Sequence, residues 1–431
     1  MVLDKKLSRR QLLGAGIGGA AAVATLSSFG PAAAFAAPAA SPGAGRLIPG
    51  EKVGTITFTQ RDVPGRLGIS TGSPTMGYLG GANFPADPTD LGPLVPLPGG
   101  WKELLAYLAG VGFEQIEFAG YGQNAANPGG AAPNPVVGGA VTPESAAAYL
   151  AYATTLRGFL DENGLEAIGN HGFIPNTWPG PSSAGGAMTT LDRDRWTVEL
   201  EFASILGMPF MGTGNDPTSS SQVEAWDVAA EKWEALNTLA LPYGISIYPH
   251  NHDPAYGFVQ DGPMVTVTVA RQTGLPLVTP QVVRGESGLR KMQAYLDRTP
   301  RDLCRIEMDI YWAYVARHIH RWRYDWEGNR VEDIFDPLAQ VAKQPLRYPL
   351  YHAKDGDSTG QAPGVGQGYT MVPFGDPTSD IDFATFFEEQ GARGYHNPNY
   401  EQDNAPGGGA DPGRSLRFSA ISAHNMNALR G

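Results

Sequence analysis

The sequence predicts an α/β protein of the closed (β/α)₈ class, a TIM barrel formed by one domain. Three observations support this prediction. Short apolar runs alternate with amphipathic stretches in eight consecutive strand–helix units, and such alternation requires parallel strands joined by crossover helices. The units run from residue 66 to residue 430, a length that a barrel with insertions needs. Polar side chains follow the predicted strands, at the end where barrel enzymes hold their sites.

An open doubly wound sheet is the alternative architecture. It rarely keeps eight regular units, and it usually carries a glycine-rich phosphate loop after its first strand. The one such stretch, "GAGIGG", lies near the amino terminus within a predicted export signal. We therefore favour the barrel.

The elements follow one another in a regular order. Residues 101–112 have apolar side chains at helical spacing, and residues 142–164 open with Thr142 and Pro143 and close on Asn163-Gly164. The same criteria place the other helices at 192–207, 221–244, 289–299, 336–344, 382–391 and 415–430. Short apolar or β-branched runs place the strands at 66–71, 115–121, 165–172, 209–216, from Ile245 onward, 304–313, 349–355 and 394–403.

One long insertion interrupts this rhythm after the fifth strand, at about residues 254–288. It contains "MVTVTVARQTGLPLVTPQVV", in which alternating valine and threonine predict a β-hairpin. The hairpin leaves the barrel at the face where the site is expected. It is therefore either a lid over the site or a surface insertion without a role in binding.

Residues 1–36 are interpreted as a twin-arginine export signal. The segment has Arg9 and Arg10, an apolar stretch rich in glycine and alanine, and a small-residue ending at Ala34-Phe35-Ala36. A membrane anchor is the alternative, although this stretch is weakly hydrophobic for a spanning helix. Residues 37–65 are interpreted as an exposed leader, and the barrel is expected over 66–431. Export predicts an extracellular, periplasmic or cell-envelope location.

The charge of the exported chain limits its partners. The whole chain carries −12 and residues 1–36 carry +3, so the remainder carries −15. This charge disfavours nucleic acid and anionic membranes as partners and favours a small molecule. The single cysteine, Cys304, excludes an internal disulfide, and it lies in an apolar run that suits a core position.

Histidines and carboxylates gather at the ends of several predicted strands. Metal ions are held by such mixed ligands when different strands bring them to one face. A lone histidine at a strand end would more often be structural, so the prediction depends on the joint pattern. The residues are Glu117, His171, His250, Asn251, His252, Asp253, Glu307, Asp309, Trp312, His352, Lys354, Asp355, Glu401 and Asp403.

Four stretches resemble the xylose-isomerase-like barrels, the sugar phosphate isomerase/epimerase superfamily that also contains endonuclease IV. They are "YPHNHD" (248–253), "EMDIYWA" (307–313), "YHAKD" (351–355) and "YEQD" (400–403), in the order that the family shows. The resemblance implies one divalent cation, with Mn²⁺ as the first expectation and Mg²⁺, Co²⁺ or Zn²⁺ as alternatives. It also implies Asp309, His352 and Glu401 as three of the four ligands.

The fourth ligand departs from the family pattern. Relatives place a glutamate on or just after the fifth strand, whereas this chain has His250-Asn251-His252 followed by "DPAYGF". We expect His250 to replace that glutamate, with His252 or Asp253 as alternatives.

The resemblance implies proton abstraction next to the carbonyl of a sugar, with Glu401 as the base. Lys354 is expected to act as an acid or to stabilise the oxyanion. A two-base epimerisation would need His250, His252 or Lys354 as its second base. With one base, the alternatives are isomerisation and β-elimination from a 3-keto glycoside.

Further residues are candidates for contact with the substrate: His171, His252, Trp312 and Glu117. Trp312 either stacks on a sugar ring or belongs to the core. His318 and His320 have a spacing that suits a metal, but a solvated loop is the favoured interpretation. A carbohydrate-binding protein without catalysis and an endonuclease-IV-like phosphodiesterase remain as alternative functions.

Overall fold

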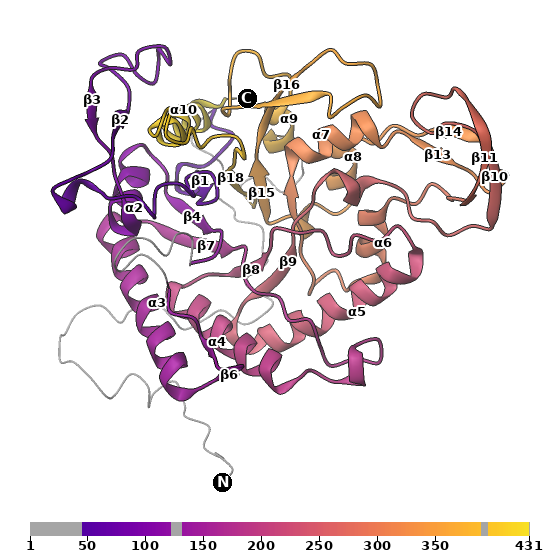
Figure 1. The fold of residues 1–431 in the computed structure, drawn as a ribbon, viewed down its shortest axis with the longest axis horizontal. Helices are drawn as coiled ribbons and strands as arrows, with labels where there is room; N and C mark the ends of the chain where they lie inside the picture. Colours follow the sequence, from indigo (N-terminus) through magenta and orange to yellow (C-terminus); the bar gives the residue numbers. More distant parts are fainter. Residues whose placement is uncertain (1–44, 122–131, 389–394, 431) are drawn as a thin grey trace, which may run out of the picture. The chain divides into compact units, whose positions relative to one another are not determined.

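The computed structural model describes residues 45–121, 132–388 and 395–430, and they form an α/β TIM barrel (Figure 1). The predicted export signal lies outside these residues. Neighbouring barrel strands pair in parallel, in the order β12-β15-β18-β1-β4-β7, with β8 and β9 as a further parallel pair. The eight barrel strands are β1 (Gly54–Ile56), β4 (Gln115–Phe118), β7 (Glu166–Asn170), β8 (Phe210–Thr213), β9 (Ser246–Pro249), β12 (Glu307–Asp309), β15 (Leu350–Ala353) and β18 (Asn397–Tyr400).

Isolated contacts join the two groups of strands. A parallel bridge between His171 and Gly212 connects the end of β7 to β8. Between β9 and β12, the Asn251 side chain accepts a hydrogen bond from Asp309 N (3.1 Å) and donates one to Asp309 O (3.4 Å). The buried Asn237 amide pairs with both the N–H and the C=O of Ile247 in β9. These side chains satisfy backbone groups that a neighbouring strand would otherwise satisfy.

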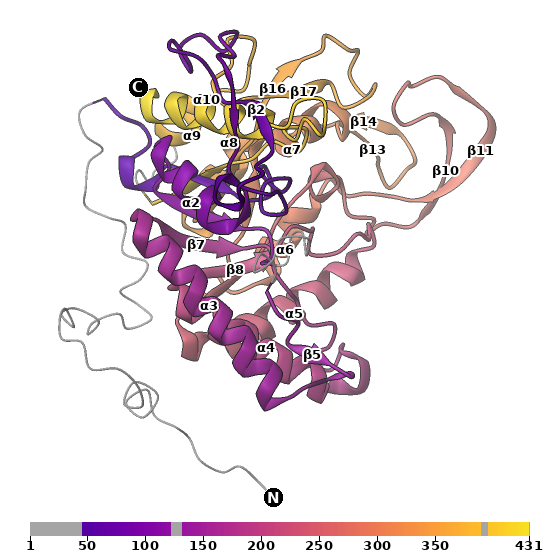
Figure 2. The same cartoon turned by 60° about the vertical axis from the view of Figure 1, so that its left-hand side comes forward.

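Helices surround the strands (Figures 1 and 2). The predicted α3 begins at its Thr142 cap, where Thr142 and Ser145 form a capping box, and it ends before Gly164, which has a positive φ. The helices are α2 (Gly100–Gly110), α3 (Pro143–Asn163), α4 (Thr190–Leu206), α5 (Val223–Ala240), α6 (Lys291–Arg298), α7 (Ile310–Ile319), α8 (Pro337–Ala342), α9 (Phe383–Glu388) and α10 (Arg414–Ala428).

The first strand differs from the prediction. It is β1 at Gly54–Ile56, whereas Ile69–Thr71 form a short 3₁₀ helix in which Ile69 is 55% exposed. The expected leader is therefore wrong in its second half, because Val53, Ile56 and Val63 are fully buried in the barrel. A long segment containing the hairpin β2–β3 (Met76–Tyr78 and Leu94–Pro96) separates β1 from α2. The run at residues 66–71, which was predicted as the first strand, therefore lies outside the barrel sheet.

The sixth strand is shorter than predicted. Strand β12 ends at Asp309, and α7 begins at the next residue, because the Asp309 side chain caps the helix by accepting from Trp312 N (3.0 Å). Trp312 and His318 therefore lie in α7, and His320 is its C-cap residue.

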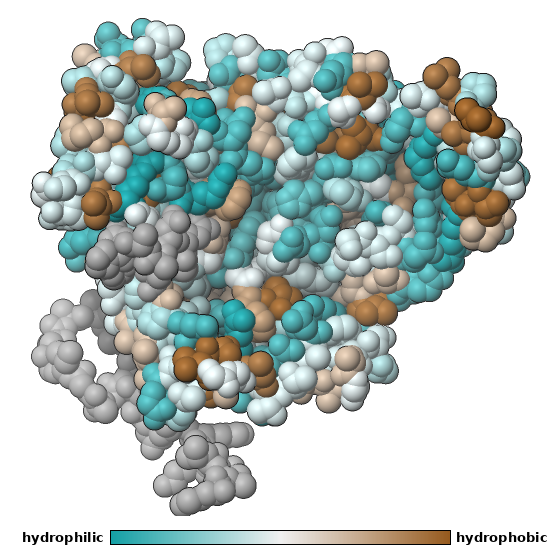
Figure 3. All heavy atoms as spheres, in the orientation of Figure 1, coloured by the Kyte–Doolittle hydropathy of each residue, from teal (hydrophilic) through white to brown (hydrophobic). Residues whose placement is uncertain are grey.

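The insertion after β9 is the predicted antiparallel hairpin, β10 (Met264–Val269) and β11 (Pro276–Arg284). It extends away from the barrel strands in both ribbon views (Figures 1 and 2). Arg271 anchors it to Glu286 through two hydrogen bonds (2.7 and 3.0 Å). Apolar side chains gather on its surface (Figure 3), including Met264, Val278 and Val282. A role as a lid stays a prediction.

Further hairpins decorate the loops, and two cores stabilise the barrel. The hairpins are β5–β6 (Val136–Val137 and Ala140–Val141), β13–β14 (Trp322–Tyr324 and Arg330–Glu332) and β16–β17 (Asp355–Ser358 and Tyr369–Val372). The main core contains Cys304 and the aromatic residues of α5. A smaller cluster of Ile168, Phe210, Tyr248 and Leu350 takes one side chain from each of four strands, so it fills the barrel interior. Among the described residues, the helices lack the length and apolarity that crossing a membrane requires.

Candidate active site

Charged side chains from six barrel strands meet at the carboxyl ends of those strands. Four carboxylates lie there with three imidazoles and one ammonium group, and all but one of these eight side chains are at most 6% exposed. Buried charges are tolerated when opposite charges and hydrogen bonds compensate them. The residues are Glu117, His171, His250, Glu307, Asp309, His352, Lys354 and Glu401.

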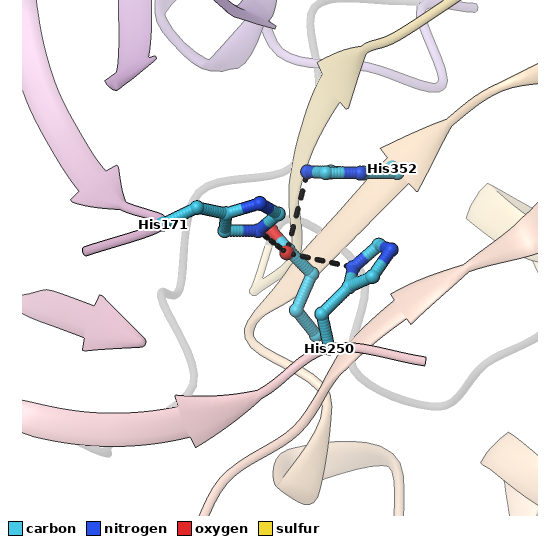
Figure 4. Close-up of side chains that lie close together, drawn as sticks. His171, His250 and His352 are labelled. Atoms are coloured by element: carbon cyan, nitrogen blue, oxygen red, sulfur yellow. Dashed lines mark hydrogen bonds and ion pairs between the residues drawn. The ribbon is translucent and has the colours of Figure 1, made fainter. Parts of the chain in front are cut away.

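One carboxylate oxygen lies at the centre of the three imidazoles. In Figure 4, His171, His250 and His352 point toward one another, and the dashed contacts converge on a single oxygen. That oxygen is Glu307 Oε2, at 2.6 Å from His171 Nε2, 3.0 Å from His250 Nδ1 and 3.2 Å from His352 Nε2. Although burial opposes ionisation, His352 and His171 hold the pKa of Glu307 well below its usual value.

Asp309 and Glu401 lie near the second ring nitrogens of His250 and His352, the nitrogens that do not contact Glu307. Asp309 Oδ2 is 3.7 Å from His250 Nε2 and 3.9 Å from His352 Nδ1, while Glu401 Oε2 is 2.7 Å from His352 Nδ1. The two faces of His250 and His352 thus meet different carboxylates. We call these the Glu307 face and the Asp309 face.

Lys354 compensates the carboxylates of the Asp309 face. Its Nζ lies 2.8 Å from Asp309, 2.6 Å from Glu401 and 3.0 Å from Asp403. Against the effect of burial, Asp309 and Glu401 raise the pKa of Lys354 well above its ordinary value, so the amine is charged. Lys354 and His352 in turn hold the pKa of Glu401 well below the usual value despite its burial.

Burial and neighbouring charges shift the pKa values of His250 and His352 in opposite directions. Desolvation and the neighbouring His352 lower the pKa of His250 well below its ordinary value, so this imidazole is neutral. Although burial opposes it, Glu307 and Glu401 raise the pKa of His352 well above the ordinary value. The neutral form is the one that can bind a metal ion.

The remaining predicted residues lie around this cluster. His252 and Trp312 face each other with ring centroids 5.5 Å apart, and Lys354 Nζ is 5.5 Å from the Trp312 ring. Trp312 also packs against the core. Glu117 is fully buried and is hydrogen-bonded by Tyr248 and Asn399. The substrate contacts of these residues stay predictions.

His318 and His320 have other partners. His318 Nε2 lies 3.1 Å from Val365 O, and His320 Nε2 lies 2.8 Å from Asp253 Oδ2. Within the described ranges, neither belongs to a group that could hold a metal ion. Their spacing therefore reflects the end of α7 rather than a metal site, and they do not form the solvated loop that was the alternative.

Two groups of four residues could hold a divalent cation. In each group, the ligand atoms lie within 4.8 Å of one another. One group contains the four ligands expected from the sequence, His250, Asp309, His352 and Glu401, and the other contains His171, His250, Glu307 and His352. Both mix imidazole nitrogen with carboxylate oxygen, a donor set that suits Mn²⁺, Co²⁺ and Zn²⁺.

A family model described as "xylose isomerase-like TIM barrel" matches residues 105–401. The chain belongs to this family. Its matched region contains every barrel strand from β4 to β18, and therefore all the residues of the cluster. A search of curated proteins finds no match.

Solved structures with similar folds have low sequence identity. A sugar phosphate isomerase/epimerase from Parabacteroides distasonis is 16% identical, with 91% of this chain and 98% of that chain covered and a TM-score of 0.47. A xylose isomerase domain protein from Planctomyces limnophilus is 14% identical, with 79% and 93% covered and a TM-score of 0.43. An AP endonuclease of family 2 from Brucella melitensis is 13% identical, with 70% and 87% covered and a TM-score of 0.36.

The site contains residues to which no role was assigned from the sequence. Glu307 precedes Asp309 by two residues, so both side chains lie on the same face of β12. Glu307 was therefore already among the strand-end residues predicted from the sequence, but no role was assigned to it. Tyr248 and Asn399 have no comparable signal in the sequence, because their contacts with Glu117 join strands that are distant in the sequence.

Proposed function

We propose that this protein is an exported, divalent-metal-dependent enzyme of the sugar isomerase/epimerase type, which removes a proton next to the carbonyl of a sugar or keto-sugar. One observation carries the proposal. Four residues chosen from the sequence as metal ligands, on or just after four different strands, have ligand atoms within 4.8 Å of one another. Mixed histidine and carboxylate ligands of this kind form catalytic metal sites in many barrels.

The ligands of the proposed ion are His250 Nε2, Asp309, His352 Nδ1 and Glu401. Bonds from such ions to nitrogen or oxygen are about 2.0–2.2 Å long, so two ligand atoms on one ion lie at most about 4.4 Å apart. The distances of 3.7, 3.9 and 2.7 Å on the Asp309 face satisfy this limit. A bound ion would act as a Lewis acid on a substrate carbonyl oxygen.

Glu401 is the proposed base. Its carboxylate is ionised because Lys354 and His352 hold its pKa low, and it can therefore accept a proton from a carbon next to a carbonyl. Lys354 is charged and carries protons at Nζ, so it can donate a hydrogen bond or a proton to the oxygen that becomes negative. His252 and Trp312, which lie near Lys354, are the proposed contacts for the sugar, together with His171 and Glu117.

The histidine at position 250 affects the choice of reaction. It takes the place of a family glutamate, so Glu401 is the one glutamate among the four proposed ligands. One base can move a proton between adjacent carbons, which is isomerisation. It can also remove a proton while a β-substituent leaves, and β-elimination from a 3-keto glycoside is therefore the second candidate reaction.

The location and the partners follow from charge and from the amino-terminal segment. The twin-arginine pattern in residues 1–36 supports export, and a charge of −15 on the remaining chain supports a neutral small molecule rather than nucleic acid. Sugar phosphates are cytoplasmic metabolites, so export favours unphosphorylated sugars as substrates.

Deuterium exchange tests this function. We would incubate the Mn²⁺-loaded protein with keto sugars and 3-keto glycosides in D₂O and measure deuterium in the sugar and release of the aglycone. We expect exchange by the wild type and at least a 10²-fold loss in Glu401→Gln. The matched control, Glu199→Gln, removes a buried carboxylate that is hydrogen-bonded to Tyr149 instead.

Three results would contradict the proposal. Full turnover by Glu401→Gln would remove this residue from the mechanism. Tight sugar binding without any exchange would favour a carbohydrate-binding protein, and cleavage of abasic DNA would favour a phosphodiesterase.

A further inference from the structure

Each shared histidine can serve only one of the two candidate cation positions. A neutral imidazole has one nitrogen with a lone pair, which can bind a metal, and one N–H, which must find an acceptor when buried. His250 and His352 belong to both groups of possible ligands, and each presents one nitrogen to the Glu307 face and the other to the Asp309 face. For the neutral His250, the position of the N–H therefore decides which face its lone pair can serve.

For His250, the two placements of the proton differ in their partners. A proton on Nδ1 points to Glu307 Oε2 at 3.0 Å, which is a normal hydrogen-bond distance. A proton on Nε2 would face Asp309 Oδ2 at 3.7 Å, which is too long for a hydrogen bond. Because His250 is 2% exposed, the second placement would leave the N–H of a buried side chain without an acceptor among the described residues.

Glu307 is built to accept such a hydrogen bond. It is fully buried, and its Oε2 contacts three imidazole nitrogens, whereas its Oε1 has no hydrogen-bond partner among the described residues. His352 differs from His250 in this respect, because its Nε2 also lies 3.1 Å from Glu117 Oε2. His250 therefore depends on Glu307 more than His352 does.

We propose that Glu307 is the positioning residue that fixes His250 in the Nδ1–H form and so aims its Nε2 lone pair at the Asp309 face. This inference deepens the proposed function and rests on it for its consequence, the place of the cation. Ligand histidines of metal sites commonly donate their second N–H to a carboxylate, which fixes the ring and its tautomer. By making His250 a ligand on the Asp309 face, Glu307 thereby compensates for the glutamate that the fifth strand lacks.

Two measurements on the whole protein test this role. The first is the ¹⁵N spectrum of histidine-labelled, metal-free protein at pH 8, with the His250 signals identified from their loss in His250→Gln. We expect the proton on Nδ1 in the wild type and its loss from Nδ1 in Glu307→Leu. The second is the Mn²⁺ affinity by titration, which should fall about 10–100-fold in Glu307→Leu.

Asp309→Asn and Glu199→Gln are the matched controls. Asp309→Asn removes a proposed ligand on the same strand, so it should abolish Mn²⁺ binding and leave the proton of His250 on Nδ1. Glu199→Gln removes a buried carboxylate elsewhere in the barrel and should change neither readout. If Glu307→Leu does not fold, Glu307→Gln replaces it, and we expect a weakened Nδ1–H signal and a smaller loss of affinity.

The outcomes separate this inference from the proposed function. A wild-type proton on His250 Nε2, or a tautomer and affinity unchanged in the Glu307 variants, would overturn the role of Glu307 while leaving a metal enzyme possible. A wild type with the Nδ1 proton but without Mn²⁺ binding would support the role of Glu307 and overturn the proposed function.

Discussion

The Asp309 face and the Glu307 face of the two shared histidines differ in how their negative charge is compensated. On the Asp309 face, the ammonium of Lys354 contacts three carboxylates at 2.6–3.0 Å. On the Glu307 face, Glu307 and Glu117 contact imidazoles and neutral donors, among them Tyr248 and Asn399. A metal ion could take the place of the Lys354 ammonium on the Asp309 face, because both are cations. The hydrogen-bond donors of the Glu307 face instead hold the site's side chains in place. The difference favours the Asp309 face as the place of the proposed ion, with the Glu307 face orienting the histidines.

Among the substitutions that test this difference between the two faces, removal of Lys354 should lower the stability most. Lys354→Met leaves Asp309 and Glu401 buried without their cation, and breaking a buried ion pair costs about 3–5 kcal/mol of stability. We expect the metal-free variant to lose about this much free energy of unfolding in urea, and Mn²⁺ to restore part of it. A loss below about 1 kcal/mol would show that the ammonium does not compensate these carboxylates.

His396 is a buried histidine without a carboxylate partner. It therefore shows the effect of burial on an imidazole that lacks the carboxylate contacts of the site's histidines. Its Nδ1 donates to Tyr348 O (2.6 Å), its Nε2 has no partner among the described residues, and burial lowers its pKa to about 4. Because the unfolded chain has a pKa of about 6.5 at this group, the unfolded state binds more protons between these values. Stability from this residue is complete above about pH 6.5 and is lost as the pH falls toward 4.

The expected size is about 2 kcal/mol between pH 7.5 and pH 5, since one pKa unit corresponds to about 1.4 kcal/mol. Urea unfolding of the wild type and of His396→Gln at both pH values isolates this residue from the other histidines. An equal pH dependence in the two proteins would show that His396 does not titrate in this way.

Glu117→Gln should have the smallest effect. Burial and the neighbouring Glu307 raise the pKa of Glu117, so a neutral amide of similar shape resembles its protonated form. Tyr248 and Asn399 still meet polar atoms, and we expect a loss of about 1 kcal/mol in urea unfolding. A loss as large as that of Lys354→Met would mean that both faces depend equally on fixed charge.

The sequence predicted the repeated strand–helix units well because each unit carries its own local signal. Helix α3 has a threonine cap, a proline in its first turn and a closing glycine, and its predicted bounds are confirmed. Strand β1 was missed because it is three residues long and lies far from its helix α2. Its stability comes from pairing with β18 and β4, which are distant in the sequence.

The site shows the same division between local and distant information. His250, Asp309, His352 and Glu401 lie at or just after the ends of strands that could be predicted from the sequence, and the structure brings the four together. Trp312 was placed on a strand because the apolar run "MDIYWA" conceals the helix start at Asp309. The proposed role of Glu307 depends on histidines from other strands, a geometry that no local pattern encodes.

Metal content is the most direct test of whether these strand ends form a metal site. We would measure it by elemental analysis of protein purified without chelator and then incubated with Mn²⁺, beside the double variant Asp309→Ala/His352→Ala. The account predicts about one divalent ion per chain in the wild type and none in the variant. A wild type without metal, or a variant that keeps it, would contradict the account.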